Sequence, residues 1–100
     1  MMLTPLKLVV IVAEETIAPK IVADVKRLGA SGYTTSEAHG EGSRAKRAGR
    51  VGETNLRIEA VVGADVAARI MAHLAETYFP HYATIAWTSD VDVVRGDKYV

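Results

Sequence analysis

The sequence predicts an α+β fold made of two strand–helix–strand halves joined by a long loop. Two observations carry this prediction. In each half, apolar residues recur first with strand spacing, then with helix spacing, then with strand spacing again. Between the halves, residues 39–50 contain no large apolar side chain. This order is typical of a ferredoxin-like βαββαβ sandwich, in which both helices lie on one face of the sheet.

Composition and charge limit the class of protein. One hundred residues, 49% of them hydrophobic and 24% charged, indicate one globular domain over residues 1–100. Twelve basic and twelve acidic residues give zero formal net charge, which disfavours a nucleic-acid binder. The absence of cysteine excludes disulfides and thiolate metal sites. The apolar run at residues 6–13 is too short for membrane insertion and has no signal cleavage pattern, so we expect a cytoplasmic protein.

The first half begins with a strand and continues into an amphipathic helix. Residues 6–12 form a β-branched, mostly apolar run that is typical of an interior strand. Over residues 17–28, apolar side chains recur at spacings of four, four and three, which predicts a helix with one buried stripe. Thr16 is the expected N-cap, Pro19 fits the first turn, and Gly29 is the expected helix stop.

The two halves meet at a loop between the second and third strands. The second strand is expected over residues 32–38 and leads into a loop at about residues 40–54. The third strand, residues 56–62, alternates apolar and polar side chains and therefore has one buried face. The loop cannot bury enough apolar surface to hold itself rigid, so we expect it to be mobile.

The second half repeats the pattern of the first. Asp65 is the expected cap of a helix that runs to about Phe79, because Pro80 forbids its continuation. Residues 81–88 are expected to form a fourth strand. Residues 91–94 are expected to form a short last strand.

The strands are apolar on both faces, whereas the helices can cover only one. We therefore expect a second copy of the chain to cover the other face, in a homotrimer. Met71 and Trp87 are expected in the core rather than at a binding surface.

The loop carries groups that bind anions. Gly40 and Gly42 allow a left-handed backbone and a close approach to a ligand. Successive backbone N–H groups in such a turn can form an anion-binding nest. Ser43 adds a hydroxyl group, and Arg44 and Arg47 add forked guanidinium donors. These residues predict a site for a phosphate or a small oxyanion; the alternative is a solvated connection without a ligand.

No catalytic or metal-binding pattern is apparent. Ser43 has no general base near it in sequence except His39, four residues away in the same loop. Glu14 and Glu15 are more typical of a solvated turn than of an acid–base pair. The three histidines do not have metal-ligand spacing. We therefore expect a protein that is not an enzyme.

Over residues 7–94 the chain resembles a known family, the PII signalling proteins. Residues 29–34 (Gly-Ala-Ser-Gly-Tyr-Thr), followed by Glu37, Gly40 and Gly42, resemble the segment that leads into the PII T-loop. Residues 40–47 resemble more closely the carboxysome-associated and bicarbonate-transport branch, called SbtB-like. Tyr78-Phe79 and Tyr82-Ala83 also resemble that branch.

The resemblance implies a homotrimer that binds adenine nucleotides between subunits and docks partners through the T-loop. Backbone groups of the two loop glycines would approach the nucleotide, and the serine and arginines of the loop would contact its phosphates. The implied nucleotide-binding positions are Thr34, Gly40, Gly42, Ser43, Arg44, Arg47 and Glu59. Arg95 and Lys98 are further candidates for contacts with a neighbouring subunit's phosphates.

One departure from the family bears on the ligand. The Gly/Lys-rich phosphate loop of the nitrogen-regulating members is replaced by residues 79–82, Phe-Pro-His-Tyr, which favours ADP or AMP over a triphosphate with magnesium. The branch implies bicarbonate as a second ligand and a bicarbonate transporter or carboxysome protein as partner. The alternative from the residues alone is a ferredoxin-like interaction module whose basic loop docks an acidic partner without nucleotide.

Overall fold

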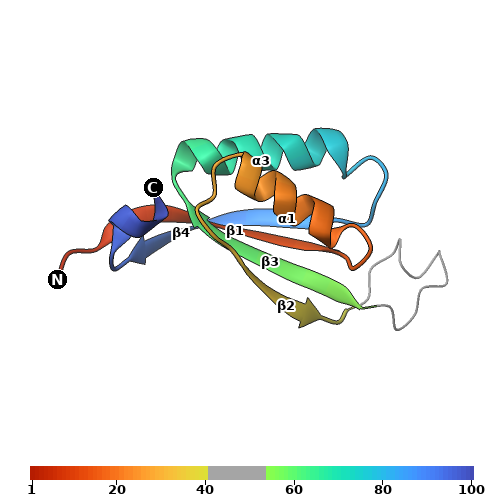
Figure 1. Cartoon of the computed structure of the whole chain (residues 1–100), viewed down its shortest axis with the longest axis horizontal. Helices are drawn as coiled ribbons and strands as arrows, with labels where there is room; N and C mark the ends of the chain where they lie inside the picture. The colour runs from red at the N-terminus through yellow and green to blue at the C-terminus, as the bar shows by residue number, and fades with distance from the viewer. Residues whose placement is uncertain (41–53) are drawn as a thin grey trace.

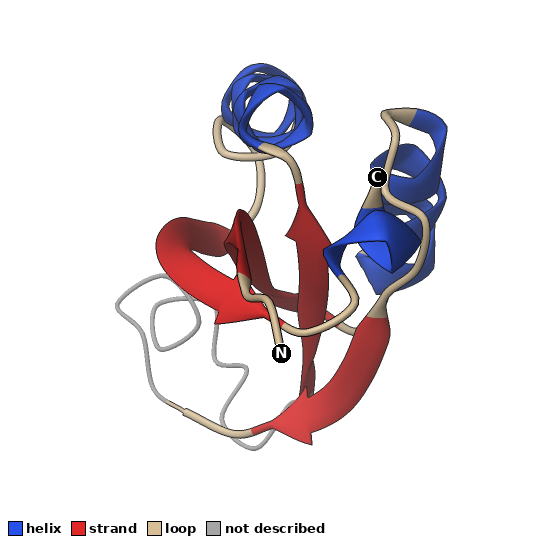
Figure 2. Cartoon of the chain, turned by 90° about the vertical axis from the view of Figure 1, so that its left-hand side faces the viewer, coloured by secondary structure: helices blue, strands red, loops and turns tan. Residues whose placement is uncertain are grey.

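The computed structural model describes residues 1–40 and 54–100. In chain order its elements are β1 (Thr4–Glu14), α1 (Ala18–Arg27), β2 (Thr34–Ala38), β3 (Asn55–Val62), α3 (Ala64–Thr77), β4 (Ile85–Val93) and a 3-10 helix, η1 (Gly96–Tyr99). The four strands form one antiparallel sheet in the order β2-β3-β1-β4. Both helices lie on the same side of this sheet (Figures 1 and 2). The predicted ferredoxin-like α+β fold is confirmed.

The core lies between the helices and one face of the sheet. β1 is central because it is long enough to pair with β3 on one side and with β4 on the other. Alternate residues of β1, such as Val9 and Ile11, point toward the helices and are buried. They pack with Ile21, Val25, Ile58, Val62, Ile70 and Leu74. Burying each such side chain contributes roughly 1.5–3 kcal/mol.

Helix α1 ends where the sequence predicts but begins differently. Gly29 has φ +126°, and the N–H groups of Gly29 and Ala30 donate to the carbonyl groups of Lys26 and Val25, at 3.1 and 3.2 Å. This Schellman-type ending requires the left-handed backbone that glycine adopts without strain. Thr16 is not the N-cap.

The start of α1 is set by a backbone turn. The N–H of Ile17 donates to the carbonyl of Glu14, at 3.1 Å, so the chain turns before the helix and Ile17 occupies the cap position. No side chain caps this end, and Pro19 lies in the first turn as expected. The turn geometry, rather than the residue type, therefore decides where α1 begins.

Helix α3 begins at Ala64, with Gly63 as its N-cap. The prediction that Asp65 caps this helix is wrong, because Asp65 lies inside the first turn. A carboxylate there still interacts favourably with the N-terminal end of the helix dipole. The helix ends at Thr77, and the N–H of Tyr82 donates to the carbonyl of Tyr78 in the turn that follows.

One long strand replaces the two short strands that were predicted after α3. β4 begins at Ile85 rather than at residue 81, and it pairs continuously with β1 from Val12↔Ile85 to Thr4↔Val93. His81 and Tyr82, which were predicted to begin this strand, instead form part of the turn after α3, where their N–H groups donate to the carbonyl of Tyr78. Asp90 and Asp92 interrupt the apolar pattern but remain in the strand, because both side chains are exposed to solvent.

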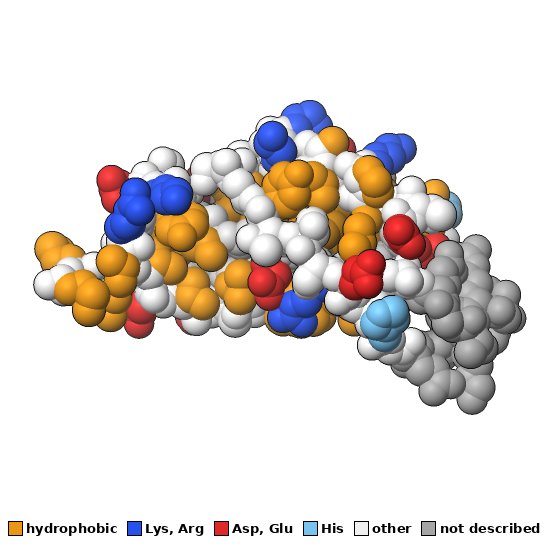
Figure 3. Space-filling model, turned by 60° about the horizontal axis from the view of Figure 1, so that its bottom comes forward, with side chains coloured by type: hydrophobic (Ala, Val, Ile, Leu, Met, Phe, Trp, Pro, Cys, Tyr) orange, Lys and Arg blue, Asp and Glu red, His pale blue; other side chains and the backbone are white. Residues whose placement is uncertain are grey.

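The face of the sheet opposite the helices is open. Cross-strand partners share a face, so the register places Leu8, Val10, Val12, Val61, Ile85 and Trp87 on this open face. Trp87 is 40% exposed and Ile85 57% exposed, so the prediction that Trp87 lies in the core of the chain is wrong. Met71 is partly buried against the core, as predicted. Figure 3, turned so that the bottom of Figure 1 comes forward, shows hydrophobic side chains at the surface.

Candidate functional site

The structure holds the two ends of the predicted ligand-binding loop together. Ala38, the last residue of β2, is the cross-strand partner of Asn55, the first residue of β3. The chain leaves and re-enters the sheet at this one pair, which we call the loop root. Four of the predicted site residues lie outside the described residues: Gly42, Ser43, Arg44 and Arg47.

Gly40, two residues after β2, is the described glycine of the predicted anion nest. Its backbone is not in the left-handed region: among the glycines of the described residues, a positive φ is found at Gly29 and not at Gly40. A Cβ atom added at Gly40 would meet no atom within 4 Å. The backbone conformation therefore does not require glycine at this position, and the open space around it leaves room for a ligand to approach.

Thr34 and Glu59 are brought together by the β2–β3 ladder. They are direct cross-strand partners, so both side chains lie on the open face of the sheet. β2 is an edge strand, which places this pair at the rim of that face. Thr34 is exposed and the side chain of Glu59 is 37% exposed. A hydroxyl and a carboxylate thus stand side by side where a ligand or a second chain can reach them.

Arg57 links Glu59 to Trp87 of β4, the strand at the other edge of the sheet, on the same open face. Its Nε–H donates to Glu59 Oε1 at 3.0 Å, two residues along the same face of β3. Its guanidinium carbon also lies 5.5 Å from the ring centroid of Trp87, which is within the range of a cation–π contact. The side chains of Arg57 on β3 and Trp87 on β4 therefore meet on this face, although β1 lies between their strands.

The open face has a polar half and an apolar half. On β2 and β3 the side chains of this face include Thr34, Ser36, Asn55, Arg57 and Glu59. On β1 and β4 they include Leu8, Val10, Val12, Ile85 and Trp87. Val10 is fully buried although no helix covers this face, because it lies between Glu59 and Trp87 in the ladder.

Sequence reasoning did not find the polar cluster that joins the two helices. Asp24 of α1 accepts a hydrogen bond from the hydroxyl of Tyr78, at the C-terminal end of α3. His73 Nε2 lies 2.9 Å from the same carboxylate oxygen, Oδ2. Arg27 Nη2 lies 3.4 Å from Asp24 Oδ1. The Tyr78 side chain is buried in the core, so this cluster fixes the end of α3 against α1.

The cluster changes the acidity of its members. Burial alone would raise the pKa of Asp24, but the hydrogen bonds from Tyr78, His73 and Arg27 outweigh it and lower that pKa below 3.8. Burial, reinforced by the bond to the Asp24 carboxylate, raises the pKa of the Tyr78 hydroxyl well above its usual range. Asp24 is therefore ionised and Tyr78 protonated at neutral pH.

The amino-acid sequence gives only a weak indication of this cluster. Asp24 lies three residues after Ile21 and four before Leu28, so it borders the apolar stripe of α1 instead of facing solvent. Its partners are 49 and 54 residues away in sequence, and no local pattern pairs them.

The segment between α3 and β4 is held at two points. Tyr78 anchors its start, and the N–H of Ala83 donates to Glu14 Oε1 at the end of β1, at 3.1 Å. Tyr82 packs at a ring distance of 6.2 Å from Tyr78. The expectation that Glu14 lies in a solvated turn is wrong, because this side chain is buried and hydrogen-bonded. This end of the molecule is the end at which the loop root lies (Figure 1).

The C-terminal segment with Arg95 and Lys98 packs on the far end of β1. Arg95 has φ +63°, and Gly96 sits so close to Thr4 that an added Cβ would lie 2.4 Å from the Thr4 side chain. The hydroxyl of Ser31 donates to the carbonyl of Lys98 at 3.3 Å. Both cations are exposed and lie at the end of the molecule away from the loop root (Figure 1).

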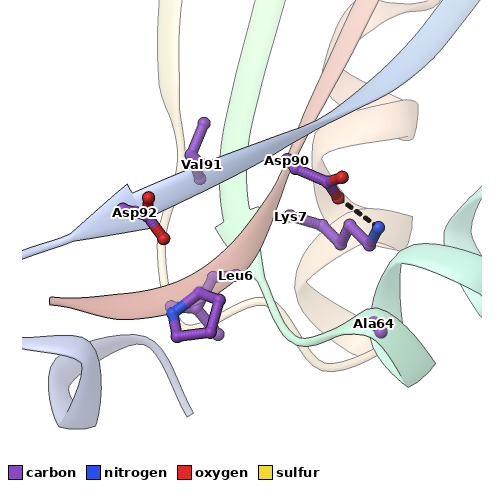
Figure 4. Close-up of a pocket in the computed structure, with 7 residues that line it drawn as sticks. Leu6, Lys7, Ala64, Asp90, Val91 and Asp92 are labelled. Atoms are coloured by element: carbon purple, nitrogen blue, oxygen red, sulfur yellow. Dashed lines mark hydrogen bonds and ion pairs between the residues drawn. The ribbon is translucent and has the colours of Figure 1, made fainter.

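A shallow hollow of about 380 Å³ lies beside this segment, between β1, β4 and the start of α3 (Figure 4). An ion pair between Lys7 and Asp90 lines it, together with Pro5, Leu6, Ala64, Val91 and Asp92. It contains none of the predicted site residues. Within residues 1–40 and 54–100 no group of three or more His, Cys, Asp or Glu side chains could hold a metal ion. No helix in the same residues is long and apolar enough to cross a bilayer.

Comparisons with known proteins agree with this geometry. The family model described as nitrogen regulatory protein P-II matches residues 6–98. A protein from Thermus thermophilus described as PII-like and signalling is 51% identical, with a TM-score of 0.87 and all of both chains covered.

Two more distant solved structures share the fold. CPII from Thiomonas intermedia K12, bound to ADP and bicarbonate, is 21% identical, with a TM-score of 0.84 and 98% and 97% of the two chains covered. GlnK from B. subtilis, in complex with ATP, is 21% identical, with a TM-score of 0.59 and 87% and 82% covered.

Proposed function

Because the chain belongs to the nitrogen regulatory protein P-II family, we propose that it is a regulatory protein that binds an adenine nucleotide between the subunits of a homotrimer. The single observation that carries this proposal is the Thr34–Glu59 pair at the rim of an open sheet face, on the strands that hold the loop root. The proposed role is one of signalling rather than catalysis, with all 100 residues acting as one domain.

The proposed site combines described residues with the loop. Thr34 and Glu59 would contact the sugar or base through hydroxyl and carboxylate groups. Backbone groups at Gly40 and Gly42 would approach the phosphates. Ser43, Arg44 and Arg47 would donate to phosphate oxygens. Arg95 and Lys98, at the far end of the subunit, could reach a nucleotide only from a neighbouring copy.

ADP and AMP are the proposed ligands. The α3–β4 connection, held by Asp24 and Glu14, contains no lysine or glycine between Phe79 and Tyr82 that could bind a terminal phosphate. CPII, which shares this fold, was solved with ADP and bicarbonate. By analogy we propose bicarbonate as a second ligand, a role in inorganic-carbon or energy signalling, and a bicarbonate transporter or carboxysome protein as the T-loop partner. We propose accordingly that the chain belongs to the SbtB-like branch.

Calorimetry with AMP, ADP, ATP and cyclic AMP on the purified full chain tests the ligand. We expect saturable binding of ADP or AMP and weaker binding of ATP with magnesium. If none of the four binds, the nucleotide proposal is wrong. Light scattering at micromolar concentration tests the assembly, and a monomer there would contradict packing through the open sheet face.

A second candidate function is favoured by the four cations at positions 44, 46, 47 and 50. In that case the chain is a ferredoxin-like interaction module whose loop docks an acidic protein without any nucleotide. The same calorimetry separates the two, because only the first candidate requires a nucleotide to bind.

A further inference from the structure

Arg57 is the side chain that crosses the boundary between the polar and apolar halves of the open face. Its strand, β3, is separated from the strand of Trp87 by β1. It nevertheless contacts both Glu59, at 3.0 Å, and the Trp87 ring, at 5.5 Å. The guanidinium group has five N–H donors in a rigid plane, so one side chain can stack on a ring and hold a carboxylate at once.

We propose that Arg57 is a positioning residue that holds the Glu59 carboxylate for the nucleotide and couples it to the surface on which a second copy of the chain packs. The inference rests on the proposed function. Arg57 Nε–H occupies Oε1 of Glu59, which orients the other oxygen, Oε2. In the proposed site, Oε2 would accept a hydrogen bond from a ligand hydroxyl or amino group.

The Trp87 ring connects this arrangement to assembly. Trp87 and Ile85 are large apolar side chains that stay 40% and 57% exposed in the single chain. Aromatic side chains of this kind anchor interfaces when a partner buries them. Among the described strand residues, the register also places Glu14 on the open face, where it accepts the N–H of Ala83 at the end of β1. Next to Trp87, the charges of Arg57 and Glu59 compensate each other, so two copies could meet there without a local excess of one charge.

A second copy that covers Trp87 would exclude water from the cation–π contact. Such a contact is stronger when desolvated, so packing would restrict the motion of the Arg57 side chain. Glu59 would then be held in one orientation before the nucleotide arrives. By linkage, a nucleotide that needs this orientation should in turn favour the assembled state.

The experiment compares the full-length parent with R57M, R57K, W87F and the double variant R57M/W87F. ADP affinity is measured by calorimetry and mass by light scattering. R69M is the matched control, because Arg69 on α3 forms an exposed ion pair with Asp65 at 3.7 Å, away from the open face. R57K keeps the positive charge and the long apolar stem but loses the Nε donor and the planar group.

We expect R57M and R57K each to weaken ADP binding about tenfold, because R57M loses the charge-assisted hydrogen bond to Glu59 and R57K loses the planar donor that fixes its orientation. R69M should bind like the parent. W87F should weaken binding less than R57M, and in the double variant it should add nothing further, because its effect acts through Arg57.

Three outcomes overturn the inference. If R57K binds ADP like the parent, charge alone suffices and Arg57 does not position Glu59. If the effects of R57M and W87F are additive, the two residues are not coupled. If the parent binds no adenine nucleotide, the proposed function fails, and this inference fails with it. If R57M fails to assemble, the ADP affinity of R57K alone tests whether Arg57 positions Glu59.

Discussion

The guanidinium carbon of Arg57 lies 5.5 Å from the centroid of the Trp87 ring, although a whole strand, β1, separates their strands. The two side chains meet on the open face, where Val10 of β1 is fully buried although no helix covers that face. This contact divides the open sheet face into a polar half at the loop root and an apolar half. In the proposed assembly, this division would place the ligand contacts next to the subunit contacts.

Glu59 should contribute directly to nucleotide affinity. E59Q removes the negative charge while it keeps the size of the side chain. A hydrogen bond to a charged group is worth roughly 1.5–3 kcal/mol, so ADP affinity should fall about tenfold or more. E37Q is the control, because Glu37 pairs with Leu56 and so points to the helix side of the sheet. Equal affinities of E59Q and the parent, measured by calorimetry, would remove Glu59 from the site.

Arg44 and Arg47 should bind phosphate. Replacing either by Ala removes a charge-assisted contact worth roughly 1.5–3 kcal/mol, and ADP affinity should again fall about tenfold. Arg27, which is paired with Asp24 on α1, provides a control substitution outside the loop. If both loop variants bind ADP like the parent, the phosphate assignment is wrong.

Bicarbonate and ADP should bind cooperatively. A small singly charged oxyanion held by backbone N–H groups and one arginine binds weakly in water, and ordering the loop costs about 1–2 kcal/mol per residue. A bound nucleotide that already holds the loop residues next to the loop root would remove part of this cost, and the coupling must be equal in both directions. ADP titrations with and without bicarbonate, at fixed pH and ionic strength, measure this coupling.

An ADP affinity that does not change at saturating bicarbonate would mean that the two sites are uncoupled. Mutual weakening would mean that both anions compete for Ser43, Arg44 and Arg47. The protein would then respond to the ratio of the two ligands.

Asp24 should contribute to stability at neutral pH and lose that contribution in acid. Its pKa is lowered in the folded state, so its stabilising effect is present above its unfolded value, near 3.8, and is lost as pH falls through the folded value. Chemical denaturation should show D24N to be less stable by roughly 1–3 kcal/mol at pH 7.

The difference between D24N and the parent should shrink below about pH 4, where the parent's carboxyl group also becomes protonated. D65N on the exposed side of α3 serves as control, and it should lose only a modest helix-dipole interaction and an exposed ion pair, so its effect should be smaller than that of D24N. A pH-independent difference between D24N and the parent would mean that the charge of Asp24 does not stabilise the helix pair.

Gly29 should tolerate no side chain, whereas Gly32 should accept one. G29A forces alanine into a left-handed backbone and places its Cβ 3.1 Å from Val66, so unfolding should become easier by about 1–2 kcal/mol. At Gly32 an added Cβ meets nothing within 4 Å. Thermal melts of the two variants test the contrast, and equal melting temperatures would contradict the helix-ending role of Gly29.

The order of the elements, the end of α1 and the long interval between β2 and β3 could be predicted from the amino-acid sequence alone. Hydrophobic spacing reports which residues turn toward a common core, and Gly29 marks a backbone conformation that other residues avoid. The loop glycines, serine and arginines are close together in sequence and predict an anion site, and because four of them lie outside the described residues this site stays a prediction.

Contacts between side chains that are distant in sequence became visible only in the folded chain. Asp24 and Tyr78, or Arg57 and Trp87, come together because strands and helices far apart in the chain are packed side by side, and no local pattern encodes such a meeting. The structure also decided that Trp87 is exposed. A strand with apolar side chains on both faces has the same sequence whether a helix or a second copy of the chain covers it.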